Sequence, residues 1–462
     1  MMQGYFSDHP FLLRKKYVSF DINGIFSLQG LYVHKHENEL RLDSFLRYNR
    51  TPALISVPMQ VMFTSYVGLF ADFNLKKNYW AASFSYPYTN IPLEGNAFDA
   101  AFPTRAGLSL GSRFFNLTIG RGSLNIGRSL AGSMMLADTV DRLDYITASF
   151  FHKKVRLSLN VLELEPTRFV FSHEAAFRPL DWLSIRFYEG VVLNAPFDPR
   201  YLNPMMIFHN YYGWRDQTFN EKASGANGKS SVGCQFGLGF DIVPVRGLRL
   251  YGQYGQNQLQ TAFELKTYPA ARNIPNSLGG LAGIEYIYHF RFGHLSVAGE
   301  FLYANPWMYI MENKHISLYH RRKDTVAGKG KTDSYIQQWV ANPYGPDSMG
   351  AFLQMSFTEL QKYRAALGYR FLVKGENEEK FFDPRQETDK DIYYPPADRY
   401  DPIARAKTPS ANPVYFHTLS LEGSYRVIKQ LELNAGVNWT IVSSKKNGHA
   451  VDVYSSVKYT IR

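Results

Sequence analysis

The chain contains 462 residues, of which 16% are aromatic and 20% charged, and it carries a formal net charge of +11 at pH 7. This aromatic content excludes intrinsic disorder, and the single cysteine, Cys234, excludes an intramolecular disulfide. No apolar stretch approaches the ~18 residues of a membrane-spanning helix, which excludes a helical membrane protein. The basic residues are spread along the chain instead of clustering in one arm or helix, so we expect no nucleic-acid partner.

Residues 1–38 have the least regular pattern. The opening sequence MMQGYFSDHPFLLRKK lacks the basic and then apolar layout of a signal peptide, which predicts either a cytoplasmic protein or a chain numbered after processing. Lys16–His34 fits either an extra pair of strands or a segment inside a barrel. His34–Glu37 (HKHE) could bind a metal ion, but a hydrated turn also accounts for it, and we expect no metal and no cofactor. Residues 1–38 are therefore interpreted as an N-terminal periplasmic or lumenal segment.

From residue 39 onwards, apolar and polar residues alternate with a period of two. This pattern is typical of β-strands with one apolar face. A soluble β-sandwich would also alternate, although its short sheets meet in one core. The clearest predicted strands, in chain order, are Glu39–Tyr48, Arg156–Val161, Trp182–Tyr188, Tyr363–Phe371, Leu419–Val427, Leu431–Ile441 and Val451–Ile461.

The connections between these segments alternate in length. Short turns occur at every second connection, whereas the intervening connections are mostly long, as in Asn194–Ser230, Met311–Gly350 and Lys374–Pro413. Short turns on one side and long loops on the other are typical of an outer-membrane barrel, whose strands need ~9–11 residues each. We therefore predict an all-β fold, a closed antiparallel transmembrane β-barrel of about 18 strands over residues 39–462. An even strand count places both termini in the periplasm.

Two outer connections are rich in apolar residues. Phe197–Asp216 contains two prolines, two methionines and several aromatic rings, and Gly120–Arg142 combines small and apolar residues. Standing in water, such loops would expose a large apolar patch. We therefore expect both to fold inward, so that the lumen is plugged by inward-folded outer loops.

Three stretches resemble the Wzi-like capsule-assembly outer-membrane protein family. They are IGRGSLNIGRSLAGSMMLADTVDRLDYI, FSHEAAFRPLDWLSIRFYEGVVLN and RYLNPMMIFHN, within Arg105–Gln258. The similar features are a Gly-rich loop closing on Ser133 and Leu136, a strand containing Glu189, and an Asn-Pro loop with His209. The resemblance implies an 18-stranded barrel closed by its own outer loops, which acts as a surface lectin that helps to hold capsular polysaccharide.

The polar faces of the predicted strands carry more basic than acidic residues. Arginine presents a planar fork that suits carboxylate and phosphate, so such a lumen favours anionic groups such as uronic acid chains. A lattice of Arg and Glu that only satisfies the barrel interior is the alternative. The candidate ligand-binding residues of the lumen and loops are Arg186, Glu189, Arg200, Asn203, His209, Arg249, Arg364 and Arg370.

These patterns favour a surface barrel that binds and helps to anchor or assemble capsular polysaccharide. The alternative is a porin or specific uptake channel for small anionic solutes. We expect no enzyme and no catalytic residues, because neither GxSxG nor HExxH occurs. The expected location is the outer membrane of a diderm bacterium. The expected partners are outer-membrane lipid and capsular or surface polysaccharide, and we expect a monomer.

Overall fold

The computed structural model describes residues 13–14, 17–79, 87–92, 99, 102–208, 231–259, 262–267, 274–311, 314–323, 335–359, 362–382 and 406–461. Within these ranges, 18 antiparallel strands form a closed β-barrel. The last strand closes the ring, because Val451–Ile461 pairs with Gly24–His34. No helix in these ranges is long and apolar enough to cross a membrane.

The elements follow the chain in the order predicted for a barrel of consecutive hairpins. The barrel strands are β3 (Gly24–His34), β4 (Ile55–Phe63), β5 (Val67–Leu75), β7 (Arg105–Gly111), β8 (Phe115–Gly122), β9 (Leu143–His152), β10 (Val155–Glu165), β11 (Arg168–Leu180), β12 (Leu183–Asn194), β13 (Val232–Val245), β14 (Leu248–Gln258), β15 (Ser277–Phe290), β16 (Gly293–Ala304), β19 (Ser348–Glu359), β20 (Tyr363–Lys374), β21 (Val414–Ile428), β22 (Leu431–Ser443) and β23 (Gly448–Ile461). Shorter elements are β1 (Leu13–Arg14), β2 (Val18–Ile22), β6 (Tyr88–Thr89), β17 (Tyr319–Lys323), β18 (Tyr335–Trp339), α1 (Arg41–Arg50), α3 (Ala262–Thr267), α4 (Asn377–Phe382), η3 (Pro199–Leu202) and η5 (Lys314–Ile316).

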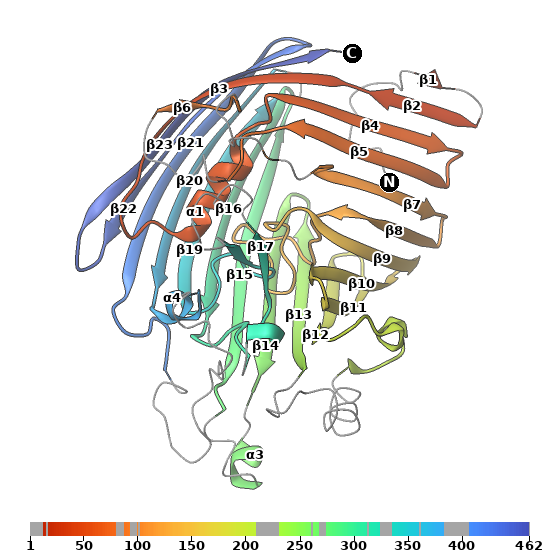
Figure 1. Cartoon of the computed structure of the whole chain (residues 1–462), viewed down its shortest axis with the longest axis vertical. Helices are drawn as coiled ribbons and strands as arrows, with labels where there is room; N and C mark the ends of the chain where they lie inside the picture. The colour runs from red at the N-terminus through yellow and green to blue at the C-terminus, as the bar shows by residue number, and fades with distance from the viewer. Residues whose placement is uncertain are drawn as a thin grey trace.

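The period of two separates the two faces of the wall. On β23, Val453, Val457 and Ile461 are exposed on the outside, whereas Asp452 is buried on the inside. Short turns join the strands at the end where the chain terminates, and the long connections gather at the opposite end, with α3 and α4 (Figure 1). The predicted all-β fold, a closed antiparallel barrel of about 18 strands, is therefore confirmed. We call these two ends of the barrel the turn end and the loop end.

The predicted first strand, Glu39–Tyr48, is wrong, because this segment forms the helix α1. Its apolar residues fit both periods, since Leu42, Phe45 and Leu46 also recur at helical spacing. Residues 39–50 contain no β-branched residue and several Leu and Arg, which favour a helix. The chain instead begins the barrel earlier: β2 pairs with β4, and β3 pairs with β23. Figure 1 shows α1 inside the curve of the strands.

The connection between β8 and β9 packs on the inner side of the wall, as expected for Gly120–Arg142. Met134 and Met135 are fully buried there, beside the segments that carry Tyr309 and Ala341. Gln253, which faces inward from β14, accepts a hydrogen bond from the backbone N–H of Met134 at 2.9 Å. The same apolar cluster includes inward-facing wall residues, namely Leu162, Val170, Val192 and Leu302. This cluster lies toward the loop end.

The expected inward packing of Phe197–Asp216 is wrong for its described part, Phe197–Phe208. Tyr201 and Phe208 are 0% exposed, but they pack on Phe171, Val191 and their neighbours, which point away from the lumen. The outward direction follows from the strand alternation, because exposed Phe177 and Phe187 lie on the same faces of β11 and β12 as these contacts. Bulky apolar side chains near the loop end thus give the segment an apolar floor on the outer wall. Residues 209–216 lie outside the described ranges.

Candidate functional site

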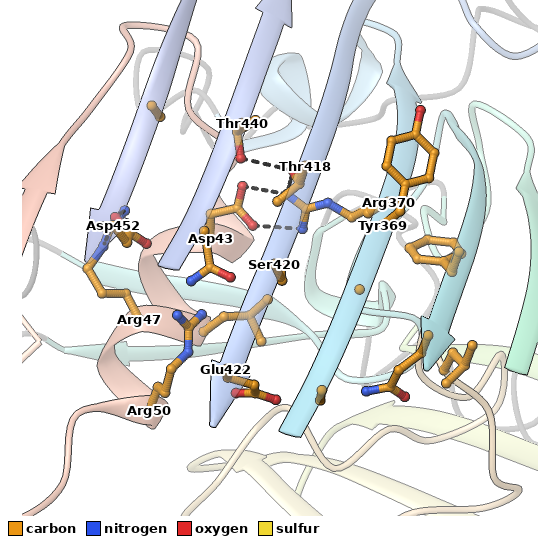
Figure 2. A pocket seen from close by; sticks show the side chains of 18 of the residues that line it. Asp43, Arg47, Arg50, Tyr369, Arg370, Thr418, Ser420, Glu422, Thr440 and Asp452 are labelled. Carbon is orange, nitrogen blue, oxygen red and sulfur yellow. Dashed lines mark hydrogen bonds and ion pairs between the residues drawn. The ribbon is translucent and has the colours of Figure 1, made fainter. Parts of the chain in front are cut away.

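A cavity of about 430 Å³ lies inside the barrel, between α1 and the inner face of β19–β23. Leu130 from the inward-folded connection and Tyr344 from the segment before β19 also line it. Figure 2 shows the cavity with Asp43, Arg47 and Arg50 on α1 and Arg370 on β20. The cavity is therefore formed by the wall together with α1, the segment that was predicted to be a strand.

The register of the strands arranges the floor of the cavity in rows. One row contains Gln354, Gly368, Ser420, Asn438 and Asp452, each on a different strand from β19 to β23. Small and medium side chains dominate this row, so the wall is hollowed opposite α1. Gly368 contributes because its missing side chain leaves space: a Cβ there would meet only Ser420 Cβ at 3.6 Å and Leu353 O at 3.9 Å.

The next row toward the loop end combines an aromatic ring, a charge and two hydroxyl groups. Its members, again one from each strand, are Phe352, Arg370, Thr418, Thr440 and Ala450. The hydroxyl oxygens of Thr418 and Thr440 lie 2.9 Å apart, and Arg370 donates to Thr418 at 2.9 Å. The ring centroids of Tyr344 and Phe352 are 5.1 Å apart, so aromatic rings line this end of the cavity.

Ion pairs join α1 to the wall on both sides of the cavity. Arg370 binds both carboxylate oxygens of Asp43, each at 2.8 Å, and the two side chains point toward one another in Figure 2. Arg47 binds Asp452 at 2.9 Å and also pairs with Glu39. Burial alone would lower the pKa of Arg47, but these two carboxylates raise it above its ordinary value, so the guanidinium stays charged.

Some polar groups of the cavity make no hydrogen bond with the described part of the protein. Within the described residues, no hydrogen bond is found for the side chains of Gln354, Ser420 and Asn438, or for Nε of buried Arg370. A hydroxyl and two amides can each donate and accept, so the cavity offers both kinds of hydrogen bond. Sequence reasoning passed over these three uncharged residues. The alternation of apolar and polar residues predicts that each of the three lies on the polar face of its strand. That they lie side by side depends on the strand register, which the alternation does not give.

Only one of the predicted ligand-binding arginines lines this cavity, namely Arg370. Arg364 lies on the same strand near the turn end, where it is exposed. Arg186 and Arg249 face inward on β12 and β14 and share a separate acidic cluster. Arg186 donates to Glu174 at 2.7 Å, and Arg249 donates to Asp241 at 2.7 Å. These two arginines therefore fit the alternative interpretation, a lattice of paired arginines and carboxylates that satisfies the barrel interior.

Three further predicted residues, Glu189, Arg200 and Asn203, do not face the lumen. Glu189 points outward, because Arg186 and Tyr188 occupy the inward alternation of β12. Arg200 lies on η3 at the outer wall, where it binds Asp198 through Nε at 2.9 Å and Nη2 at 2.8 Å. The side chain of Asn203 accepts from the backbone N–H of Met205 at 3.1 Å and so shapes the same segment. His209 lies outside the described residues.

The described residues contain no group of three or more His, Cys, Asp or Glu side chains arranged to hold a metal ion. His34–Glu37 accordingly has other contacts. Nδ1 of His36 accepts from the backbone N–H of Asn38 at 3.2 Å, and the carboxylate of Glu37 pairs with Lys446 at 3.0 Å.

Comparison with known proteins places the fold. No protein-family model and no curated protein sequence matches the chain. The solved structure of Wzi, an outer-membrane protein of Escherichia coli involved in group 1 capsule assembly and described as a carbohydrate-binding β-barrel, is 11% identical over 94% of this chain and 83% of that chain, with a TM-score of 0.53. This chain has the fold of outer-membrane β-barrels.

Two solved barrels of Pseudomonas aeruginosa also match this chain over nearly its whole length. OccK3 is 8% identical, covers 96% of both chains and has a TM-score of 0.44. OprD is 7% identical over 97% of this chain and 96% of that chain, with a TM-score of 0.43. At these identities the similarity to Wzi establishes fold alone, and a Wzi-like family is one of several that share it.

Proposed function

We propose that this chain is an outer-membrane barrel that binds, and helps to anchor or assemble, a surface polysaccharide such as capsular polysaccharide. In this proposal the turn end and both termini face the periplasm, and the loop end faces the cell exterior. The description of Wzi as a carbohydrate-binding barrel is consistent with the proposal.

The observation that carries the proposal is the apolar cluster inside the barrel near the loop end. Met134, Met135 and Tyr309 are 0% exposed and pack on inward-facing wall residues. A diffusion channel needs a continuous path of water, and side chains packed to this degree exclude water from the space that they fill. A barrel filled in this way suits binding better than bulk diffusion.

The charge of the polysaccharide does not follow from the lumenal arginines. Arg186, Arg249 and Arg370 are each held by carboxylates of the barrel itself. Arginines that are already neutralised by a partner have little remaining attraction for an anionic ligand. The pairing therefore removes the electrostatic reason for expecting uronic acid chains at these residues.

Deletion of the gene in an encapsulated host tests the proposal. We expect the mutant to synthesise polysaccharide normally but to release most of it into the medium, and re-expression should return it to the cells. The purified barrel should retain capsular polysaccharide extracted from the same host. Unchanged attachment of the capsule in the mutant, together with no retention by the purified protein, would show that the proposal is wrong.

The second candidate function is uptake of small anionic solutes. It is favoured by exposed inward-facing residues nearer the turn end, such as Arg364 on β20 and Arg156 on β10, which indicate an accessible interior there. Planar-bilayer recordings separate the two functions. Steady open events that are blocked by small anions would favour a channel, and absence of such events would favour a binding protein.

A further inference from the structure

We infer that the cavity between α1 and β19–β23 binds a short, uncharged segment of carbohydrate. This inference rests on the proposed function and adds both the place of binding and the chemical class of the ligand. The volume of about 430 Å³ lies within the range of roughly 300–1,000 Å³ that is usual for small-molecule sites.

The charges that line the cavity argue for an uncharged ligand. Arg370 is paired with Asp43, and Arg47 is paired with both Glu39 and Asp452. A charged ligand would have to compete with these pairs, and it would bring one more buried charge that needs its own partner. Counted over the whole lining, four carboxylates face three arginines, so the cavity has no excess of positive charge to attract an anionic sugar. Lys35 pairs with one of these carboxylates, Glu39, at 2.9 Å.

The hydrogen-bonding groups of the cavity match the hydroxyl groups of a sugar. Ser420 can donate and accept, and the amides of Gln354 and Asn438 each present a carbonyl oxygen beside an NH₂ group. A sugar hydroxyl also donates and accepts, so one ring could satisfy several of these groups at once. All three side chains are half-buried, so water can reach them in the free protein, and the hydroxyl groups of a sugar would replace that water.

The rings at the loop end of the cavity complete the match. Tyr344 and Phe352 present apolar surface next to the polar row of Gln354, Ser420 and Asn438. A pyranose has apolar C–H faces and a polar rim, so a site with aromatic surface at one end and hydroxyl and amide groups along its floor suits it. A small apolar solute would leave the polar floor unpaired.

The exposure of the inner wall indicates the side from which the ligand enters. Near the loop end, the inward-facing side chains of Leu372, Phe416 and Val442 are buried. Nearer the turn end of the same strands, Arg364 and Glu422 are exposed. The cavity lies between these two levels, so we place its entrance on the turn side, which is the periplasmic side in the proposed orientation.

Replacing Ser420 by a larger residue tests the assignment directly. Ser420→Trp would place an indole across the polar row, and Gly368→Leu would fill the same hollow from the neighbouring strand. Ser455→Trp is the matched control, because Ser455 lies on the exposed outer face of β23. Full-length proteins would be applied to a panel of immobilised neutral and uronate-containing oligosaccharides, after heat-modifiable gel mobility has shown that each barrel is folded.

We expect the parent and Ser455→Trp to retain neutral oligosaccharides and both cavity variants to lose at least tenfold in affinity. Equal binding by parent and folded cavity variants would place the sugar elsewhere, and binding of uronate-containing sugars alone would refute the ligand class. Both of these results overturn the inference but leave the proposed function in place. Binding of no saccharide by the parent would contradict the proposed function as well.

A labelling experiment gives a second measurement that does not depend on bulky substitutions. Ser420→Cys should react with a small, water-soluble methanethiosulfonate reagent, whereas parent protein provides the background of buried Cys234. A neutral oligosaccharide that binds the parent should slow the reaction of Ser420→Cys severalfold. An unchanged rate at saturating sugar would show that the sugar does not occupy the cavity.

Discussion

Arg370 on β20 and Asp43 on α1 form a bidentate ion pair although 327 residues separate them in the chain. Only 11% of the Arg370 side chain and 18% of the Asp43 side chain are exposed. Removing one partner from a buried pair leaves an uncompensated charge in a poorly hydrated site. The pair therefore holds α1 at a defined position on the inner face of the barrel wall.

Asp43→Asn should therefore destabilise the protein by about 3 kcal/mol. The measurement is denaturant unfolding of the refolded barrel in detergent, with intrinsic fluorescence as the signal. Glu37→Gln is the control, since Glu37 and Lys446 form a pair whose side chains are 49% and 74% exposed, and the loss there should be within about 1 kcal/mol. Equal losses in the two variants would show that the α1 pair has no special role.

The connection between β8 and β9 can be shortened without moving the ends of the two strands, although Glu300 on the wall then loses the backbone N–H groups of Leu130 and Ala131. Ile126 and Leu136 pair through a backbone hydrogen bond of 2.9 Å, so the segment leaves and returns at one place. Replacing residues 127–135 by a short Gly linker should open the region now occupied by Met134 and Met135. We expect single-channel conductance to rise severalfold in planar bilayers.

The outer segment supplies the control for this deletion. Residues 199–207 lie on the outer wall, so replacing them by a similar linker should leave conductance at the parental level. If this second deletion opens the barrel and the first does not, the positions that we assign to the two segments are reversed.

The sequence was most informative where local pattern alone decides the structure. In β21–β23 every second side chain faces lipid, so residues such as Leu421, Val437 and Val453 could be assigned to the outer face before any contact was known. The same alternation and the alternating connection lengths were enough for the closed fold, but the strand number agreed only because the count included Glu39–Tyr48, which is in the helix α1, and missed β3. None of these features depends on which strands are neighbours.

The errors occurred where the outcome depends on packing. Tyr201 and Phe208 could have covered an apolar surface on either side of the wall, and only the register of Phe171 and Val191 shows that the outer side provides it. Likewise, Gln354 and Ser420 are 66 positions apart and become neighbours in the cavity through pairing across β19, β20 and β21. A single sequence contains no signal for such a row.

Lys76 gives the protein a specific dependence on alkaline pH. Burial lowers the pKa of its ammonium group to about 8, and Nζ lies 4.1 Å from the centre of the Tyr48 ring. Between pH 8 and the ordinary Lys pKa, the unfolded chain binds more protons at Lys76 than the folded chain. This contribution to stability therefore rises with pH through that window, by an amount on the order of 2 kcal/mol between pH 8 and 10.

Lys76→Met should abolish this rise. The measurement is the free energy of unfolding of parent and variant at pH 8, 9 and 10, and the difference between the two slopes isolates Lys76 from other groups. Burial raises the pKa of Tyr48, so its opposing effect, a loss of stability with rising pH, begins only above its ordinary value of 10.0. Parallel pH profiles for parent and variant would show that Lys76 is not buried in its charged form.

The outer segment Phe197–Phe208 should be held to the wall mainly by two rings. Tyr201 and Phe208 are fully buried, and the ring of Phe208 stacks on His173 with centroids 4.1 Å apart. Truncating either ring to alanine removes apolar contacts that are typically worth about 3 kcal/mol in a packed site. Because these contacts lie outside the lumen, their loss should release the segment without opening the barrel.

Limited proteolysis measures this release. Tyr201→Ala and Phe208→Ala should each increase the rate of cleavage within residues 197–208 at least tenfold, since every ~1.4 kcal/mol of local stability changes the open population tenfold. Met205→Ser is the control, because Met205 is 83% exposed and its side chain therefore contributes little to packing. Heat-modifiable mobility and conductance should stay at parental values in all three variants, and a rise in conductance for Phe208→Ala would mean that the segment does close the lumen after all.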